Sequence, residues 1–185
     1  MKNALILHGI FNNSQGNWFP WLKQSLEQKG YKVFVPDLIN SDKPNTKKSW
    51  DYIIQKWKFY NDSIIIGHSS GGAMALGFLQ KLPKNLVIKK AILVSSFKDV
   101  LNDQYSNNRK GLFEEPFDWQ KIKNSAKEII LIHSLDDPYV KPEQAYYIQK
   151  KLGCKIYMEK HEGHFNLEKG VQYKKFPLLL KLIEN

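Results

Sequence analysis

Ser69 stands in a Gly-x-Ser-x-Gly pattern, formed with Gly67 and Gly71, whose residue types and spacing suit nucleophilic chemistry. An apolar run over residues 63–66 precedes the pattern, and a helical pattern over residues 70–81 follows it. A sharp strand-to-helix turn of this kind is a nucleophile elbow, whose strained backbone exposes the serine hydroxyl. Glycine is needed on both sides because a Cβ there would collide with the neighbouring strand or helix. The pattern favours a nucleophilic serine over a turn that only connects a strand to a helix.

Possible partners for this serine follow later in the chain. A serine hydroxyl is a weak nucleophile unless a base removes its proton, and a histidine base needs a carboxylate to fix its tautomer. After an elbow of this kind the carboxylate comes next in the chain and the histidine last. Asp136 and Asp137 follow a strand-like run over residues 128–132, and His164 follows another over residues 155–158. The residues of a Ser-Asp-His triad are therefore present in the expected order.

More than one residue could supply the acid and the base. Asp136 and Asp137 are adjacent, and one of them is expected to be a turn or helix N-terminal residue. Asp99, after the fourth strand-like run, is a weaker alternative. His164 is favoured as the base because a glycine and a phenylalanine flank it in a loop that can bring its ring to the serine. His161 is its rival.

Attack on an acyl carbon also needs hydrogen-bond donors for the negative oxygen that forms. The backbone N–H of Ser70, directly after the serine, is one candidate. The other is the backbone N–H of Ile10, in the loop that follows the first strand-like run. His8 and Gly9 open this loop, which lacks the G-x-G-x-x-G pattern of a dinucleotide site. We therefore expect an oxyanion site formed by Ile10 and Ser70.

These residues must be positioned by strands that alternate with helices along the chain. The predicted strands cover residues 4–7, 31–35, 63–66, 88–95, 128–132 and 155–158. The predicted helices cover residues 18–29, 50–57, 70–81, 119–125, 142–153 and 176–183. This alternation predicts an α/β fold with an open, mainly parallel six-stranded sheet and helices on both faces. In such sheets the functional site lies at the carboxyl ends of the strands, where each candidate residue falls.

Composition limits the organisation of the chain. With 185 residues and 42% hydrophobic content, residues 1–185 are expected to form a single domain. No apolar run approaches the roughly 20 residues that span a bilayer, and no signal-peptide pattern is present. Cys154 is the single cysteine, which excludes an internal disulfide. We expect a cytoplasmic protein.

The positive charge of the chain does not indicate nucleic-acid binding. Net charge is +10, but Arg109 is the only arginine among 28 basic residues. Bidentate recognition of phosphates and bases depends strongly on arginine, so a solvated lysine surface is the simpler interpretation. We expect a small-molecule substrate and neither nucleic acid nor a membrane as partner, and the oligomeric state stays open. His161 and His164 lack a third ligand nearby, and we expect neither a metal nor an organic cofactor.

The assembled residues resemble those of the α/β-hydrolase superfamily, and more closely the small serine hydrolases grouped with retinoblastoma-binding protein 9 and its YdeN-type relatives. The matching segments are residues 18–22, 64–71, 111–119, 134–138 and 163–165. The resemblance implies a minimal α/β-hydrolase fold without a lid domain and a triad of Ser69, Asp137 and His164. Asp137 is favoured over Asp136 because Ser134 and Val140 stand in register with the family pattern around the acid.

The resemblance further implies hydrolysis of carboxylic esters or amides of small acyl groups through an acyl-enzyme intermediate. We expect the loops over residues 11–19 and 97–117 to border the site. Two alternatives remain open at this point. The chain could be a binding protein that keeps the fold without turnover, or an acyltransferase that passes the acyl group to an amine or alcohol instead of water.

Overall fold

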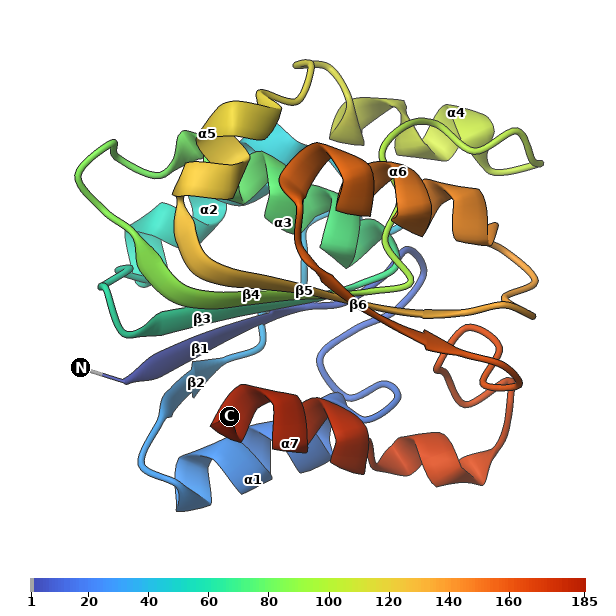
Figure 1. Cartoon of the computed structure of the whole chain (residues 1–185), viewed down its shortest axis with the longest axis horizontal. Helices are drawn as coiled ribbons and strands as arrows, with labels where there is room; N and C mark the ends of the chain where they lie inside the picture. The colour runs from blue at the N-terminus through green and yellow to red at the C-terminus, as the bar shows by residue number, and fades with distance from the viewer. Residues whose placement is uncertain (1) are drawn as a thin grey trace.

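The computed structural model describes residues 2–185, and its centre is a six-stranded sheet (Figure 1). The strands are β1 (Asn3–Leu7), β2 (Lys32–Phe34), β3 (Ser63–His68), β4 (Ile88–Val94), β5 (Ala126–Ser134) and β6 (Lys155–Glu159). Their order across the sheet is β2-β1-β3-β4-β5-β6, and each neighbouring pair is parallel. The predicted α/β sheet is confirmed, and within the described residues it is parallel throughout.

Helices cover both faces of the sheet. The α-helices are α1 (Phe19–Gln28), α2 (Thr46–Lys56), α3 (Ser70–Lys81), α4 (Ser106–Arg109), α5 (Trp119–Asn124), α6 (Pro142–Leu152) and α7 (Pro177–Glu184). Two short 3-10 helices are η1 (Lys110–Leu112) and η2 (Val171–Lys174). Helices α1 and α7 lie below the sheet in Figure 1, and α2, α3, α5 and α6 lie above it. Among residues 2–185, no helix is both long and apolar enough to cross a bilayer.

Helix α2 begins earlier than the sequence pattern predicts. The apolar period starts at Trp50, whereas the helix starts at Thr46. The side chain of Asn45 accepts a hydrogen bond from the backbone N–H of Lys48 at 2.9 Å and so caps the first turn. The sequence analysis did not predict α4, η1 or η2, which are four residues long or shorter. Elements this short carry no detectable apolar period.

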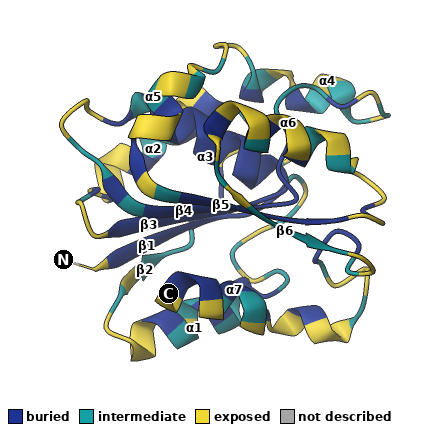
Figure 2. Ribbon diagram, in the orientation of Figure 1, coloured by how far each residue is buried: buried dark blue, intermediate teal, exposed yellow. Residues whose placement is uncertain are grey.

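The central strands β1 and β3 are buried on both faces, which explains their apolar runs, whereas the outer strands β2 and β6 are partly exposed. In β1, Ala4 and Ile6 belong to the core cluster under α1 and α7, while Leu5 and Leu7 belong to the cluster on the opposite face. All five residues of β1 are buried. Figure 2 shows the central strands as buried and the outer surfaces of the helices as exposed.

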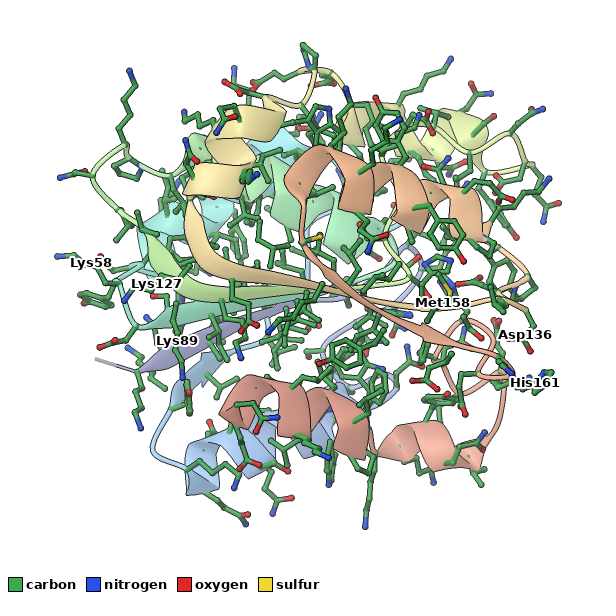
Figure 3. The ribbon with its side chains drawn as sticks, viewed as in Figure 1. Lys58, Lys89, Lys127, Asp136, Met158 and His161 are labelled. Atoms are coloured by element: carbon green, nitrogen blue, oxygen red, sulfur yellow. The ribbon has the colours of Figure 1, made fainter. Side chains whose placement is uncertain are left out.

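Because the strands are parallel, all of their carboxyl ends lie on one side of the molecule and all of their amino ends on the other. The carboxyl ends of the strands lie on the right of Figure 3, where Asp136 and His161 are labelled. The amino ends lie on the left, with Lys58, Lys89 and Lys127. The candidate residues of the sequence analysis lie at or after the carboxyl ends, as expected for an open α/β sheet.

Candidate active site

Ser69 occupies the tight turn between β3 and α3. Its backbone has φ 57° and ψ −124°, a strained conformation for a residue with a side chain. The turn is held by a hydrogen bond from its backbone N–H to the carbonyl of Val94, at 2.9 Å. A Cβ on Gly67 would lie 2.4 Å from the backbone of Gly71, and a Cβ on Gly71 would lie 2.3 Å from the carbonyl of Leu7. The two glycines are therefore required by close backbone approach, as the sequence analysis predicts.

The loop after β1 runs directly beside Ser69. A Cβ on Gly9 would lie 3.1 Å from Ser69 Cβ and 3.5 Å from its hydroxyl oxygen. The N–H of Phe11 is used in a hydrogen bond to the carbonyl of Ser41, at 3.1 Å. The N–H of Ile10 is unpaired among residues 2–185. The N–H of Ser70 is at the first position of α3, where no intrahelical acceptor exists.

His164 is hydrogen-bonded to Asp137. Its Nδ1 lies 3.0 and 2.9 Å from the two carboxylate oxygens. The same carboxylate accepts hydrogen bonds from the backbone N–H groups of Tyr139 and Val140, each at 3.0 Å. A carboxylate only accepts, so the proton of the neutral imidazole is on Nδ1 and its Nε2 lone pair is free. This is the tautomer that a general base needs.

Asp137 is held ionised by its contacts. Its side chain is 0% exposed, and this burial by itself raises the pKa of the carboxyl group. The hydrogen bond and charge of His164, followed by the N–H of Val140, act more strongly in the opposite direction, so the net pKa lies below its usual value. Ser95 also lowers the pKa of Asp137 through its nearby hydroxyl, although that hydroxyl does not reach hydrogen-bond geometry.

Asp136 faces away from the imidazole and fixes the loop that carries it. One carboxylate oxygen accepts a hydrogen bond from the Ser134 hydroxyl at 2.6 Å and from the N–H of Gly163 at 2.8 Å. The other lies 3.0 Å from the ammonium group of Lys169. All three contacts lower the pKa of Asp136. The hydrogen bond from Ser134 has the largest effect, followed by that from Gly163 and then that from Lys169. Asp99 instead accepts a hydrogen bond from the side-chain amide of Gln144, at 2.9 Å.

Two further side chains hold the loop around His164 by its backbone. The ring Nε2 of His68 lies 2.8 Å from the carbonyl of His164, and because a carbonyl only accepts, this nitrogen carries the proton. The indole N–H of Trp18 donates to the carbonyl of Phe165 at 3.0 Å. The sequence analysis missed both roles. No local pattern reveals a contact between residues about 100 or more positions apart.

The remaining histidines do not reach the candidate base. His8 donates from Nδ1 to the carbonyl of Gly9 at 2.9 Å and accepts from the N–H of Leu38 at 3.0 Å. His133 donates to the carbonyl of Val140 at 2.8 Å. Burial lowers the pKa of both rings. His161 is exposed, and no group of three or more His, Cys, Asp or Glu side chains within residues 2–185 is arranged to hold a metal ion.

The contact between His68 and His164 indicates where Ser69 lies relative to His164. The ring of His68, the residue before Ser69, lies 4.8 Å from the ring of His164 between centroids. The Ser69 hydroxyl does not hydrogen-bond to His164 in this structure. Contacts of this kind are often long in sites without substrate and tighten when it binds. The structure thus brings Asp137 and His164 into contact and places Ser69 beside their loop.

Aromatic side chains border the site. The rings of Phe11 and Tyr105 meet edge to face at 5.2 Å, which joins the two loops that the sequence analysis expects there. The ring of Tyr139 lies 5.1 Å from that of His164. Phe11 is 56% exposed, an unusual position for a large apolar side chain. Together these rings form an aromatic rim beside His164 and the loop after β1.

Comparison with known proteins identifies the family of this chain. The sequence model of the serine hydrolase family matches residues 4–185. The chain belongs to the serine hydrolase family. This serine hydrolase is 28% identical to the Bacillus subtilis (strain 168) protein YdeN over 175 residues, covering 91% of this chain and 88% of YdeN. It is also 28% identical to the serine hydrolase RBBP9 of Rattus norvegicus over 151 residues, covering 80% and 77% of the two chains.

Solved structures show the same fold. The crystal structure of the B. subtilis ydeN gene product superposes with a TM-score of 0.90 at 26% identity, covering 100% of this serine hydrolase and 97% of that chain. Est1E of Butyrivibrio proteoclasticus, solved with ferulic acid bound, superposes with a TM-score of 0.71 at 15% identity and covers 100% and 87%. The resemblance to an α/β-hydrolase of the YdeN and RBBP9 type is therefore confirmed.

Proposed function

We propose that this serine hydrolase cleaves carboxylic esters or amides of small acyl groups through a triad of Ser69, His164 and Asp137. The observation that carries the proposal is the hydrogen bond between His164 Nδ1 and the buried carboxylate of Asp137. This contact leaves His164 Nε2 free to act as a base. The backbone carbonyl of His164 accepts a hydrogen bond from the ring of His68, the residue before Ser69. The family match and the esterase folds among the structural relatives support the same assignment.

In the first half of the reaction, the Ser69 hydroxyl attacks the carbonyl carbon of the substrate while His164 Nε2 takes its proton. Asp137 stabilises the imidazolium that forms, because its buried carboxylate is ionised and already bonded to Nδ1. The free N–H groups of Ile10 and Ser70 are the donors for the oxyanion. The tetrahedral intermediate then collapses, His164 returns the proton to the leaving alcohol or amine, and an ester with Ser69 remains.

In the second half, a water molecule enters and His164 removes its proton as it attacks the acyl-enzyme. The second tetrahedral oxygen uses the same two N–H donors. Collapse breaks the bond to Ser69, whose oxygen recovers the proton from His164, and releases the carboxylic acid. No step in this scheme needs a metal or an organic cofactor.

A small apolar acyl group is supported by the rim of Phe11, Tyr105 and Tyr139. These rings offer apolar contact beside His164 and the loop after β1, and the carboxylate of Asp137 is fully buried and paired. An uncharged acyl group is therefore favoured over an ionic one. A small-molecule substrate and a cytoplasmic location remain predictions from the sequence, as does the expectation that neither nucleic acid nor a membrane is a partner.

Labelling with a fluorophosphonate probe tests the triad directly. We expect a covalent adduct on the native protein, with the modified peptide containing Ser69, and no adduct on Ser69→Ala. Ser70→Ala is the matched control, since it removes a neighbouring hydroxyl but leaves the backbone donor in place. Its labelling should remain. No adduct on the native protein would favour a binding role without turnover.

Turnover assays then define the reaction. We expect p-nitrophenyl esters of small acyl groups to be cleaved by the native protein and not by Ser69→Ala. A panel of aminoacyl amides tests whether amides are cleaved as well. Repeating the reaction with added hydroxylamine or a simple alcohol separates hydrolysis from acyl transfer. Mainly free acid as product supports the proposal, whereas mainly transferred acyl group would assign an acyltransferase.

A further inference from the structure

His133 is a buried histidine that the proposed reaction does not use. It lies near the end of β5, four residues before Asp137, and its side chain is 1% exposed. Its ring Nε2 is 4.0 Å from Asp137 Oδ2, beyond hydrogen-bond distance, whereas His164 Nδ1 is 2.9 Å from the same oxygen. Two imidazole rings therefore lie beside the candidate acid, and only one of them is bonded to it.

The ring of His133 is bonded instead to the turn that surrounds Asp137. Its Nε2 donates to the backbone carbonyl of Val140 at 2.8 Å. The backbone N–H of Val140 donates to Asp137 Oδ1 at 3.0 Å, as does the N–H of Tyr139. One backbone group of Val140 thus holds the carboxylate, and the other holds the turn against β5.

His133 supplies the donor that this turn needs. Val140 is 1% exposed and belongs to the core cluster above the sheet, so its carbonyl requires a partner inside the protein. Within residues 2–185, His133 Nε2 is the one donor that this carbonyl has. Without it, the segment that carries both N–H donors to Asp137 has no bond to the end of β5 through Val140.

The rest of the His133 ring is not used. Burial lowers the pKa of His133, and this effect exceeds the opposing effects of the Val140 carbonyl and the Asp137 charge, so the ring is neutral. Its Nδ1 is buried and has no hydrogen-bond partner among residues 2–185. An apolar side chain would pack here without that unfavourable nitrogen. The donation from Nε2 is therefore what a histidine adds at this position.

We propose that His133 is a positioning residue for Asp137, which through Val140 fixes the turn that orients the carboxylate toward His164 Nδ1. The inference rests on the proposed triad and adds to it a residue that acts through the acid. An Asp137 carboxylate held in this way stabilises the imidazolium that forms when His164 takes the serine proton. Loss of His133 should therefore slow the chemical step and leave substrate binding unchanged.

Kinetics of His133→Leu and His133→Gln on a p-nitrophenyl ester test the proposal. Leucine fills the position without a donor, so kcat should fall about 10- to 100-fold while KM changes less than about twofold. Glutamine has an amide N–H that can reach the Val140 carbonyl and should recover most of kcat.

Ile88→Ala is the matched control for lost stability, because Ile88 is buried at the amino end of β4. It should lower the melting temperature and leave kcat unchanged, and melting curves confirm that each variant is folded. Native kcat in folded His133→Leu, or equal losses in His133→Leu and His133→Gln, would overturn the proposal.

Proton NMR of protein labelled with nitrogen-15 histidine gives a second readout, which needs no turnover. A proton between an imidazole Nδ1 and a carboxylate resonates far downfield, and its loss in His164→Gln assigns the signal. We expect the signal in the native protein and in His133→Gln, and its broadening or loss in His133→Leu. An unchanged signal in folded His133→Leu would overturn the positioning role. Native turnover in Ser69→Ala would instead overturn the proposed hydrolysis, and the signal would still report on His133.

Discussion

The ring of His68 donates a hydrogen bond to the backbone carbonyl of His164, at 2.8 Å. The residue before the candidate nucleophile therefore holds the loop that carries the candidate base. Burial, and next the charge of His164, lower the pKa of His68 to about 3, so its ring is neutral at physiological pH. Being neutral, it can position His164 without competing for the carboxylate of Asp137.

Removing this contact should impair both stability and turnover. His68→Phe leaves the buried carbonyl of His164 without its donor, and we expect the free energy of unfolding to fall by about 1–3 kcal/mol. We expect kcat to fall about 10- to 100-fold, because a small displacement of a catalytic base has effects of this size. Urea unfolding and initial rates on a p-nitrophenyl ester measure the two effects. His68→Gln keeps an N–H donor of similar reach and should recover most of kcat. Equal losses in both variants would contradict a positioning role.

The two adjacent aspartates should differ sharply in their effect on turnover. Asp137→Asn removes the charge next to His164 Nδ1 and permits the wrong tautomer, so kcat should fall about 10⁴-fold. Asp136→Asn keeps an oxygen that can accept from the Gly163 N–H and loses the ion pair with Lys169. We expect less than about a 10-fold change from it, because the ion pair is partly exposed. Parallel kinetics of the two variants provide the measurement, and the opposite ranking would assign the acid to Asp136.

Stability should decrease as pH falls below about 6.5. Burial lowers the pKa of His68, His8 and His133 in the folded protein, so only the unfolded chain takes up protons there at mildly acidic pH. Each such ring stabilises the fold fully above the unfolded pKa, and this contribution is lost as pH falls toward the folded pKa. For His68 the window extends to about pH 3, with a slope of about 1.4 kcal/mol per pH unit. Urea unfolding between pH 6 and 4 should show a correspondingly smaller slope for His68→Gln. An unchanged slope would show that His68 does not titrate in this way.

The loop after β1 should be sensitive to a single methyl group. In Gly9→Ala the new Cβ would lie 3.1 Å from Ser69 Cβ, so either the serine or the loop that carries Ile10 must shift. We expect kcat to fall about 10- to 100-fold with little change in the melting temperature. Gly30→Ala is the contrasting variant, because Gly30 has φ +79° but open space around its Cα. It should lower the melting temperature and leave kcat unchanged.

Much of the site was accessible from the sequence because parallel strands carry their functional residues at one edge. Ser69 follows the buried apolar strand β3 and His164 follows the short strand β6, so the positions of these residues could be predicted from local patterns. The need for glycine at both positions of the elbow could also be predicted, because the spacing of these glycines indicates a close backbone approach, which is present in the structure.

Which of Asp136 and Asp137 contacts His164 was decided by tertiary structure. The two residues have the same chemistry and adjacent positions, and only the path of the loop after β5 turns one carboxylate to His164 and the other to Gly163. The contacts of His68 and Trp18 with the His164 loop likewise depend on residues far apart in the chain. Sequence periodicity indicates which residues are buried in a strand, and the order of residues along the chain indicates which functional residues follow the carboxyl end of that strand. Which side chains then meet is determined by how the loops pack in three dimensions.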